Sequence, residues 1–232
     1  MGKLPDYFGP MAFGLKMGVV TPGMNLESEI FSSVKACYDD GYLGDGDVIC
    51  VTESVVARAQ GNYVSVDEVA EQIRHKMNLS ERAELGVVFP IASRNRFSMI
   101  LKSIARSTRE GMVAVQFSFP YDEVGNQVIC PDFAEGLEKE VITMEDIGDR
   151  EFKHPLTHID YLNFYKEVIE SEDATPEIFL CNNPAYIKDL DVEGAVAADI
   201  HSREKTKKEI QKRLGNCITL DEICNKGKAY SE

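Results

Sequence analysis

The sequence predicts an α+β fold in which a mixed sheet is packed against helices. Two observations support this class: the spacing of apolar residues switches repeatedly between helical and strand-like periods, and short β-branched runs alternate with longer amphipathic segments. With 232 residues, of which 44% are hydrophobic, the chain is long enough for one domain of ordinary size, or two small ones, with a buried core. No repeat, low-complexity segment or linker divides the sequence, so we expect a single domain over residues 1–232.

The first part of the chain predicts a helix, a strand and a second helix. Apolar residues recur every four positions behind Asn25, a good N-cap, so a helix is predicted from Leu26 to about Tyr38. An acidic, Gly-rich turn follows, and the β-branched run 48–51 after it predicts a buried strand. Residues 53–60 then predict a short helix.

The rest of the chain repeats these two patterns. A capping segment that begins at Ser65 predicts a helix through about Met77. Further helices are predicted at 97–104, 161–169 and 202–214, and strands at 86–91, 112–119, 177–181 and 195–198. Residues 131–154 are acidic and weakly periodic, so we expect a smaller surface subdomain near 131–157.

Charge and cysteine usage exclude several classes of protein. The chain has 25 Lys and Arg against 39 Asp and Glu, a net charge of −14, which disfavours nucleic acid as a partner. No apolar run is long enough to span a bilayer, and residues 1–10 lack the layout of a signal peptide, so we expect a cytoplasmic protein with no membrane partner. The six cysteines are scattered, which favours buried free thiols over a disulfide framework or a zinc site.

Common catalytic signatures are absent from the sequence. There is no glycine series of the dinucleotide-binding type, no phosphate-binding Gly-Lys-Ser/Thr loop, no metalloprotease histidine pair and no nucleophile elbow. His154 and His158 have helical spacing, but Pro155 between them disfavours a helix and therefore a zinc site. Nucleotide binding by a less common fold stays open.

Polar residues instead gather where predicted strands end, which is where open α/β sheets place their sites. Thr52, Glu53 and Ser54 follow the first predicted strand, and their hydroxyls at a helix N-terminus suit a phosphate. The alternative is that they only cap the helix.

A second cluster, Ser93-Arg94-Asn95-Arg96, lies between a predicted strand and a predicted helix. Two arginines in such a loop suit a phosphate or a carboxylate, because a guanidinium pairs with planar oxygens in a bidentate way. The alternative is that both arginines pair with neighbouring surface carboxylates.

The third and fourth clusters carry acidic residues. Asp122, Glu123 and Asn126 supply the hard oxygen ligands that Mg²⁺ or Mn²⁺ prefers, although an acidic turn has the same composition. Asp199 follows another predicted strand and could complete this metal site. His201 or Arg203 could then contact a phosphoryl group in transfer, unless the segment only caps a solvated helix.

One segment of the chain reads Gly46-Asp47-Val48-Ile49-Cys50-Val51-Thr52-Glu53-Ser54-Val55-Val56-Ala57-Arg58-Ala59-Gln60-Gly61. It resembles the N-terminal motif of the gamma-glutamyl ligases of the deazaflavin coenzyme F-420. In that family Gly-Asp-Val leads into Val-Thr, then a helix with Val and Ala, and then Gly. The upstream Pro22-Gly23 also fits. The central family segment Cys-Ala-Asn-Ala-Gly-Ile-Asp is not legible; Val128-Ile129-Cys130-Pro131-Asp132 is its nearest counterpart.

The resemblance implies a reaction, cofactors and an assembly. Ligases of this family use a nucleoside triphosphate, typically GTP, and two divalent metal ions to activate a carboxylate as an acyl phosphate, which a glutamate amine attacks; they form an intertwined α+β homodimer. Carried onto this chain, the resemblance implies that Thr52, Glu53 and Ser54 lie near the nucleotide, GTP or ATP. Asp122, Glu123 and Asp199 become the expected ligands of Mg²⁺ or Mn²⁺. The alternative is a protein of the same fold that binds a nucleotide or an anionic metabolite without catalysis.

Overall fold

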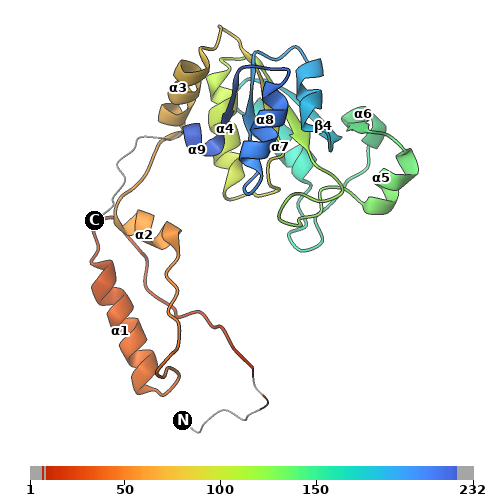
Figure 1. Ribbon diagram of the computed structural model, residues 1–232. Helices are drawn as coiled ribbons and strands as arrows, with labels where there is room; N and C mark the ends of the chain where they lie inside the picture. The colour runs from red at the N-terminus through yellow and green to blue at the C-terminus, as the bar shows by residue number, and fades with distance from the viewer. Residues whose placement is uncertain (1–6, 8, 224–232) are drawn as a thin grey trace. The chain divides into compact units, whose positions relative to one another are not determined.

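A computed structural model describes residue 7 and residues 9–223 of the chain, so Cys224 lies outside the described residues. The chain divides into two compact units, residues 1–64 and residues 65–232 (Figure 1). Each unit has its own secondary structure.

The N-terminal unit contains two helices joined by extended segments. Helix α1 (Leu26–Asp39) begins as predicted, because the Asn25 side chain accepts a hydrogen bond from the Ser28 N–H at 3.0 Å. Helix α2 (Glu53–Ala59) also confirms its prediction.

The predicted buried strand at 48–51 is wrong. These residues are extended but pair with no described strand, and the Val48 side chain is 83% exposed. The physical reason is that the described part of this unit contains no strand beside which the run could lie, so its β-branched side chains have no sheet to cover. The expectation of buried thiols fails at the same place, since Cys50 is exposed whereas Cys37, Cys181 and Cys217 are buried.

The C-terminal unit is built on a six-stranded sheet with the order β3-β4-β2-β1-β5-β6. The strands are β1 (Glu84–Val88), β2 (Met112–Phe117), β3 (Val141–Thr143), β4 (Thr175–Cys181), β5 (Gly194–Ala197) and β6 (Cys217–Thr219). Five strands run parallel and β3 pairs antiparallel with the edge of β4. This mixed sheet with helices confirms the predicted α+β class. The predicted strands at 86–91, 112–119, 177–181 and 195–198 correspond to β1, β2, β4 and β5, whereas β3 and β6 were not predicted.

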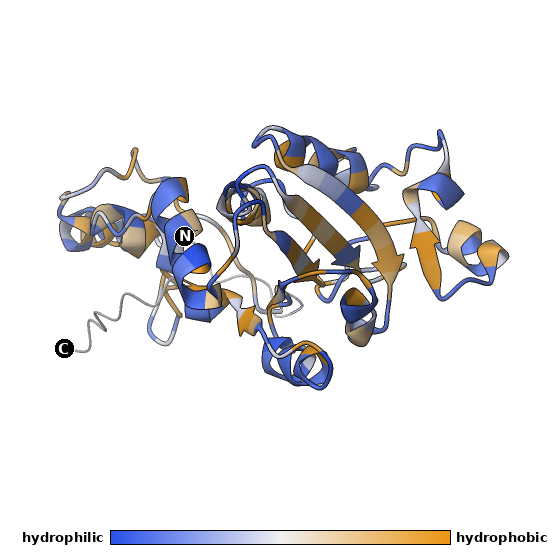
Figure 2. Ribbon diagram, turned by 90° about the horizontal axis from the view of Figure 1, so that it is seen from above, coloured by the Kyte–Doolittle hydropathy of each residue, from blue (hydrophilic) through white to orange (hydrophobic). Residues whose placement is uncertain are grey.

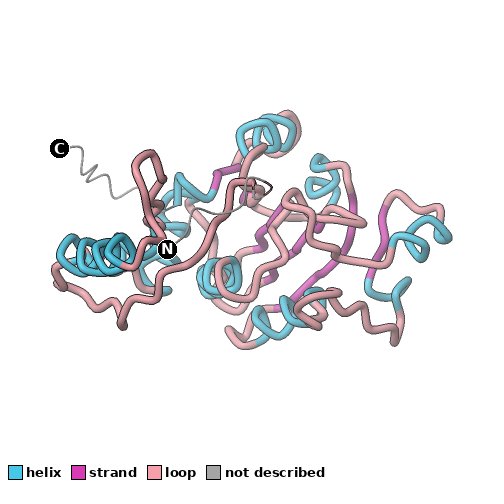
Figure 3. Tube along the Cα trace, turned by 90° about the horizontal axis from the view of Figure 1, so that it is seen from below, coloured by secondary structure: helices cyan, strands magenta, loops and turns pink. Residues whose placement is uncertain are grey.

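Helices cover both faces of this sheet (Figures 2 and 3). Helices α3 (Val66–Met77), α4 (Phe97–Ser107) and α7 (Tyr161–Glu170) bury their apolar sides in one core cluster with alternate strand residues. Helix α8 (Arg203–Gln211) and the 3-10 helix η1 (Pro184–Asp189) pack with the remaining strand residues on the other face. The strands are largely hydrophobic, as Figure 2 shows, because both of their faces are buried.

The acidic segment at 131–157 contains short elements of its own. Helix α5 (Pro131–Leu137) leads to β3, and helix α6 (Met144–Ile147) follows it with a capping box between Thr143 and Asp146. The chain ends its described part with helix α9 (Leu220–Ile223). Within the described residues, no helix is long and apolar enough to cross a membrane.

Candidate functional site

The strand order of the C-terminal unit creates a switch point between β1 and β5. From β1 the chain moves outward to β2 and then β4, and it later returns to the other side of β1 as β5 and β6. The loops that leave the carboxyl ends of β1 and β5 therefore run in opposite directions, and open α/β sheets bind ligands in the crevice that this leaves. The second, third and fourth polar clusters all belong to loops at this edge.

The loop after β1 carries Arg94 and Arg96 directly before α4. Both side chains are exposed, and within the described part of the chain neither guanidinium forms an ion pair or a hydrogen bond. The alternative of pairing with neighbouring carboxylates is therefore not seen. Ser93 Oγ accepts a hydrogen bond from the Arg96 N–H at 3.2 Å, and Asn95 is exposed between the two arginines.

Asp122 was predicted to be a metal ligand, but its carboxylate accepts hydrogen bonds from backbone N–H groups of its own turn and of the loop after β1. Its Oδ1 accepts hydrogen bonds from the N–H groups of Val124 at 3.0 Å and Asn126 at 2.8 Å. Its Oδ2 accepts from the Ala92 N–H at 2.8 Å and from the Asn126 side-chain amide at 2.9 Å. Four donors occupy the acceptor sites of a carboxylate, so Asp122 connects its own turn to the loop after β1.

Glu123 joins the turn after β2 to the loop after β5. Its carboxylate accepts hydrogen bonds from the N–H of Ile200 at 2.6 Å and from the N–H of His201 at 2.9 and 3.1 Å. Burial acts to raise the pKa of Glu123, but these bonds and those from Ser202 outweigh it and lower the pKa. The side chain occupies successive backbone N–H groups at the start of α8, a position that suits an anion.

Asp199 is a buried carboxylate at this edge, and one of its two oxygens accepts no hydrogen bond. The residue is 2% exposed; its Oδ2 accepts a hydrogen bond from the Thr206 hydroxyl at 3.0 Å, whereas Oδ1 is buried without a partner. Burial raises the pKa of Asp199, and the nearby Glu123 carboxylate raises it further. Few buried polar atoms in native structures lack a partner, and a bound ion or water is one explanation for such an atom.

The two predicted catalytic residues differ in what they contact. Arg203 donates from Nε and Nη2 to the Ile200 carbonyl at 3.1 and 2.8 Å, and its Nη1 pairs with Asp221 at 2.8 Å. Its guanidinium is thus engaged in holding the start of α8. The His201 side chain is exposed and makes no hydrogen bond or ion pair with other described residues.

Most oxygens of the predicted metal ligands are already engaged in hydrogen bonds. Asp122 and Asn126 bond each other, Glu123 is held by backbone N–H groups, and only Asp199 keeps a buried oxygen without a donor. No group of three or more His, Cys, Asp or Glu side chains among the described residues could hold a metal ion. One carboxylate fits a Mg²⁺ ion that takes its other ligands from phosphates and water, but it does not make a site built from protein ligands alone.

Two further predicted features lie elsewhere. Thr52, Glu53 and Ser54 belong to the N-terminal unit, where Thr52 is the N-cap of α2 without a side-chain cap bond and contacts the Ser54 hydroxyl at 3.3 Å. The His154 imidazole is buried, and its Nδ1 accepts hydrogen bonds from the N–H of Leu156 and of Thr157, both at 3.2 Å. That nitrogen organises a turn, as the proline between the histidines suggested.

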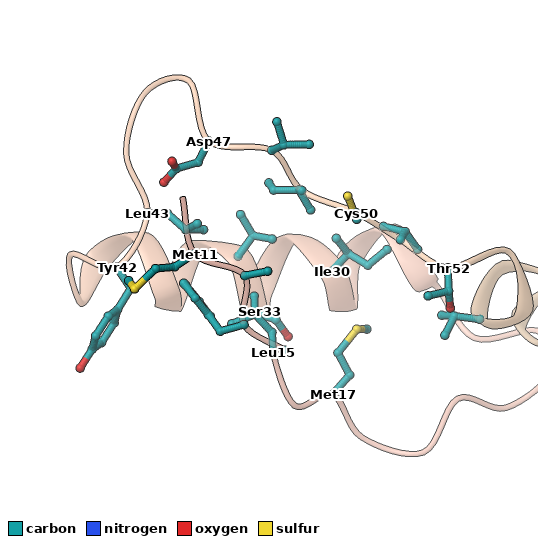
Figure 4. A pocket seen from close by; sticks show the side chains of 18 of the residues that line it. Met11, Leu15, Met17, Ile30, Ser33, Tyr42, Leu43, Asp47, Cys50 and Thr52 are labelled. Carbon is teal, nitrogen blue, oxygen red and sulfur yellow. The ribbon is translucent and has the colours of Figure 1, made fainter. Parts of the chain in front are cut away.

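The N-terminal unit contains an apolar pocket of about 630 Å³. It lies between α1 and the extended segments on either side of that helix, and Figure 4 shows Leu15, Met17, Ile30 and Cys50 around it. Thr52 is at its border. The pocket offers few groups that bind an anion, so it is not the expected environment of a triphosphate.

Two residues at the switch edge were missed by sequence reasoning. Tyr165 in α7 donates a hydrogen bond to the Ile91 carbonyl at 2.5 Å and accepts one from the Ser93 N–H at 3.1 Å. Gln116 in β2 is fully buried, and its amide nitrogen donates to the carbonyls of Cys181 and Asn183. Tyr165 has the helical spacing of a core residue, so no sequence signal distinguished it. Gln116, a polar residue inside an apolar strand, was the one available signal.

The fold and its polar edge define a protein with an α+β core and a cluster of polar side chains at a topological switch point. The model of the F420-0:gamma-glutamyl ligase family matches residues 14–222 of the 232 residues. The chain belongs to this family, which supports a gamma-glutamyl ligase-like function and confirms the resemblance seen in residues 46–61. No curated protein and no solved structure matches the chain.

Proposed function

We propose that this protein is an amide-forming ligase that uses a nucleoside triphosphate, GTP or ATP, to join a carboxylate to an amine. The family membership supports the reaction class. The observation that carries the proposal for this chain is the pair Arg94 and Arg96, two exposed cations without an ion pair among the described residues of a protein with a net charge of −14. They lie before the N-terminus of α4, where a phosphate is stabilised by helix N–H groups as well as by guanidinium groups.

The proposed reaction has two steps. A carboxylate oxygen of the first substrate attacks the γ-phosphorus of the triphosphate, and the bond to the β-phosphate breaks with release of the diphosphate. The amine nitrogen of the second substrate then attacks the acyl carbon, loses a proton and expels inorganic phosphate as the amide forms. Both steps develop charge on phosphate oxygens, which positively charged donors stabilise.

Individual residues receive roles from their surroundings. Arg94 and Arg96, with Ser93 and Asn95 beside them, would bind the phosphates. His201 has an uncommitted imidazole at the same edge and is a better candidate for proton transfer than Arg203, whose guanidinium is engaged.

A divalent ion, Mg²⁺ or Mn²⁺, belongs to this proposal as part of the nucleotide complex. Asp199 would supply one oxygen to it and the phosphates would supply the others, which is the usual way in which Mg²⁺ is held at nucleotide sites. Such an ion neutralises the charge of the transferring phosphoryl group.

A binding experiment with matched variants tests the proposal. Titration of GTP and of ATP, each with Mg²⁺, Mn²⁺ or chelator, is expected to stabilise the wild type by about 2.7 kcal/mol at a hundredfold excess over Kd. The double variant Arg94→Ala, Arg96→Ala is expected to weaken the binding by about a hundredfold or more, since each of the two lost charge-assisted bonds contributes roughly 1.5–3 kcal/mol. Arg213→Ala removes a similarly exposed arginine from the far end of α8 and should leave the affinity unchanged.

Turnover separates the ligase from its alternative. Repeated turnover that releases the nucleoside diphosphate and inorganic phosphate only when both a carboxylate and an amine are present would support the ligase. Binding without consumption of the triphosphate would favour a non-catalytic protein that binds a nucleotide or an anionic metabolite. No stabilisation by any nucleotide would contradict the ligase and a non-catalytic nucleotide-binding protein alike.

We also propose that the protein is a homodimer in which the N-terminal unit covers apolar surface. Among the described residues of that unit, the buried apolar side chains are Cys37 and Ala59. Its exposed large apolar residues include Met11, Phe13, Val19, Phe31, Tyr38, Tyr42, Val48, Ile49, Val51, Tyr63 and Val64. So much exposed apolar area, together with the unpaired β-branched run 48–51, favours pairing with a second copy.

Sedimentation of two matched variants tests the dimer. Val48→Asp places a charge on a side chain that is 83% exposed in the N-terminal unit, and Leu156→Asp does the same at 85% exposure in the C-terminal unit. The first is expected to shift the protein toward monomer and the second to leave the assembly unchanged. A wild type that sediments as a monomer at all concentrations would contradict the dimer.

A further inference from the structure

Two buried side chains from distant parts of the chain hold the backbone of the loop after β1. The Tyr165 hydroxyl donates to the Ile91 carbonyl at 2.5 Å and accepts from the Ser93 N–H at 3.1 Å. Asp122 Oδ2 accepts from the Ala92 N–H between them at 2.8 Å. The backbone of residues 91–93, immediately before Arg94, is therefore held by two buried side chains.

The surroundings of both side chains make them rigid. Tyr165 is fully buried, with its ring centroid 5.7 Å from that of Phe97 and 5.2 Å from that of Phe117. Burial raises the pKa of Tyr165, so the phenol keeps its proton and remains a donor. Asp122 is 6% exposed, and its three other hydrogen bonds bind it to its own turn.

The loop needs such support because the repulsion between its two positive charges disfavours a single ordered conformation. Arg94 and Arg96 repel each other, and without a bound anion nothing else among the described residues pairs with either guanidinium. When only a fraction of molecules holds a binding-competent loop, the apparent Kd rises by the inverse of that fraction. Groups that fix the loop in advance remove this loss.

We propose that Tyr165 and Asp122 are positioning residues that hold the loop 91–96 in its phosphate-binding conformation. The inference rests on the proposed function of Arg94 and Arg96, and it gives Asp122 a role other than metal ligation. It also gives a physical reason for the hydroxyl of Tyr165, whose ring is fully buried against those of Phe97 and Phe117.

A matched pair of variants on one helix tests the proposal. Tyr165→Phe removes the hydroxyl and keeps the ring. Tyr161→Phe is its control, because Tyr161 is also buried on α7, but its hydroxyl contacts the Thr157 side chain at 3.4 Å instead of the loop. The probe is inorganic pyrophosphate, whose Kd is measured by calorimetry with and without Mg²⁺, and the exchange of the amides at 89–97 is measured by mass spectrometry.

The expected result is a rise of about tenfold in the Kd of Tyr165→Phe, as when the competent loop falls to roughly a tenth of the population, with faster exchange at 91–96. Tyr161→Phe should match the wild type in both measurements. Asp122→Asn weakens the other hydrogen bond to this loop, the one from the Ala92 N–H, and should resemble Tyr165→Phe in both measurements. It serves as the second variant if the Tyr165→Phe protein folds poorly.

Unchanged affinity and unchanged loop exchange in Tyr165→Phe would overturn the inference. A wild type that does not bind pyrophosphate would overturn the proposed phosphate site instead, while faster exchange at 91–96 in Tyr165→Phe alone would still support the positioning of the loop.

Discussion

Replacement of Asp199 by asparagine is expected to stabilise the C-terminal unit at neutral pH. The wild-type carboxylate is 2% exposed and its Oδ1 has no donor, so the native state holds a poorly solvated charge. Asparagine has nearly the same shape and keeps an oxygen for the Thr206 hydroxyl, 3.0 Å away, but it carries no charge. An unsatisfied buried group costs about 1–3 kcal/mol, and since the new N–H also lacks a partner, we expect a net gain of about 1 kcal/mol.

The pH dependence of this gain follows from the direction of the pKa shift. Burial raises the pKa of Asp199 in the folded protein, so the native state binds the proton more tightly than the unfolded state does. The wild type therefore loses stability as the pH rises from the unfolded pKa through the folded pKa. The advantage of Asp199→Asn should be complete above the folded pKa and should disappear below the unfolded one.

The assay is thermal unfolding of both proteins across the acid and neutral range in the presence of chelator, since a bound cation would reverse the sign. A gain of 1 kcal/mol corresponds to a rise in Tm of about 2–4 °C for a unit of this size. Asp189→Asn, at a side chain that is 49% exposed, should change stability by less than about 0.5 kcal/mol. A destabilised Asp199→Asn, or a gain that does not vary with pH, would refute the reasoning.

Three further changes test the fold. Ser65→Ala removes the hydroxyl of a capping box at the start of α3 and should cost about 1 kcal/mol in urea unfolding. Gly111→Ala would put a Cβ 2.0 Å from the Ala83 carbonyl oxygen, so the backbone must shift and the free energy of unfolding should fall by roughly 2–4 kcal/mol. Glu172→Gln weakens the bonds from Arg106 that hold the pKa of Glu172 below its usual range; it should cost about 1–3 kcal/mol at neutral pH, a loss that fades as acid protonates the wild-type carboxylate.

Local patterns were sufficient for most of the C-terminal unit. The helix after Ser65 was predictable because its cap, its apolar spacing and its buried face all agree, and the apolar runs that became β1, β2, β4 and β5 are buried on both faces. Strands β3 and β6 were missed because three residues each carry no readable period.

The failure at 48–51 has a different origin. β-branched composition reports that a segment suits a sheet, but it does not say where the partner strand comes from. In the described part of this chain that partner is absent, and the same residues are exposed. The composition therefore indicates that the segment suits a sheet, and it agrees with the pairing between copies of the chain proposed above.

The position of the candidate site could be predicted from the sequence, but the role of each of its residues could not. Oxygen ligands such as those of Asp122, Glu123 and Asp199 look equivalent in a sequence, because residue type sets what a side chain can bind and not what it already binds. The fold distinguishes them: Asp122 has four donors and Glu123 is held by N–H groups at the start of α8, whereas Asp199 keeps one unpartnered oxygen. A carboxylate whose oxygens are filled by backbone donors fixes loops, and one that is buried with an empty oxygen costs stability. Selection retains a loss of stability where function needs it. A cation bound in the function proposed above would give a physical reason for the buried, unpartnered oxygen of Asp199.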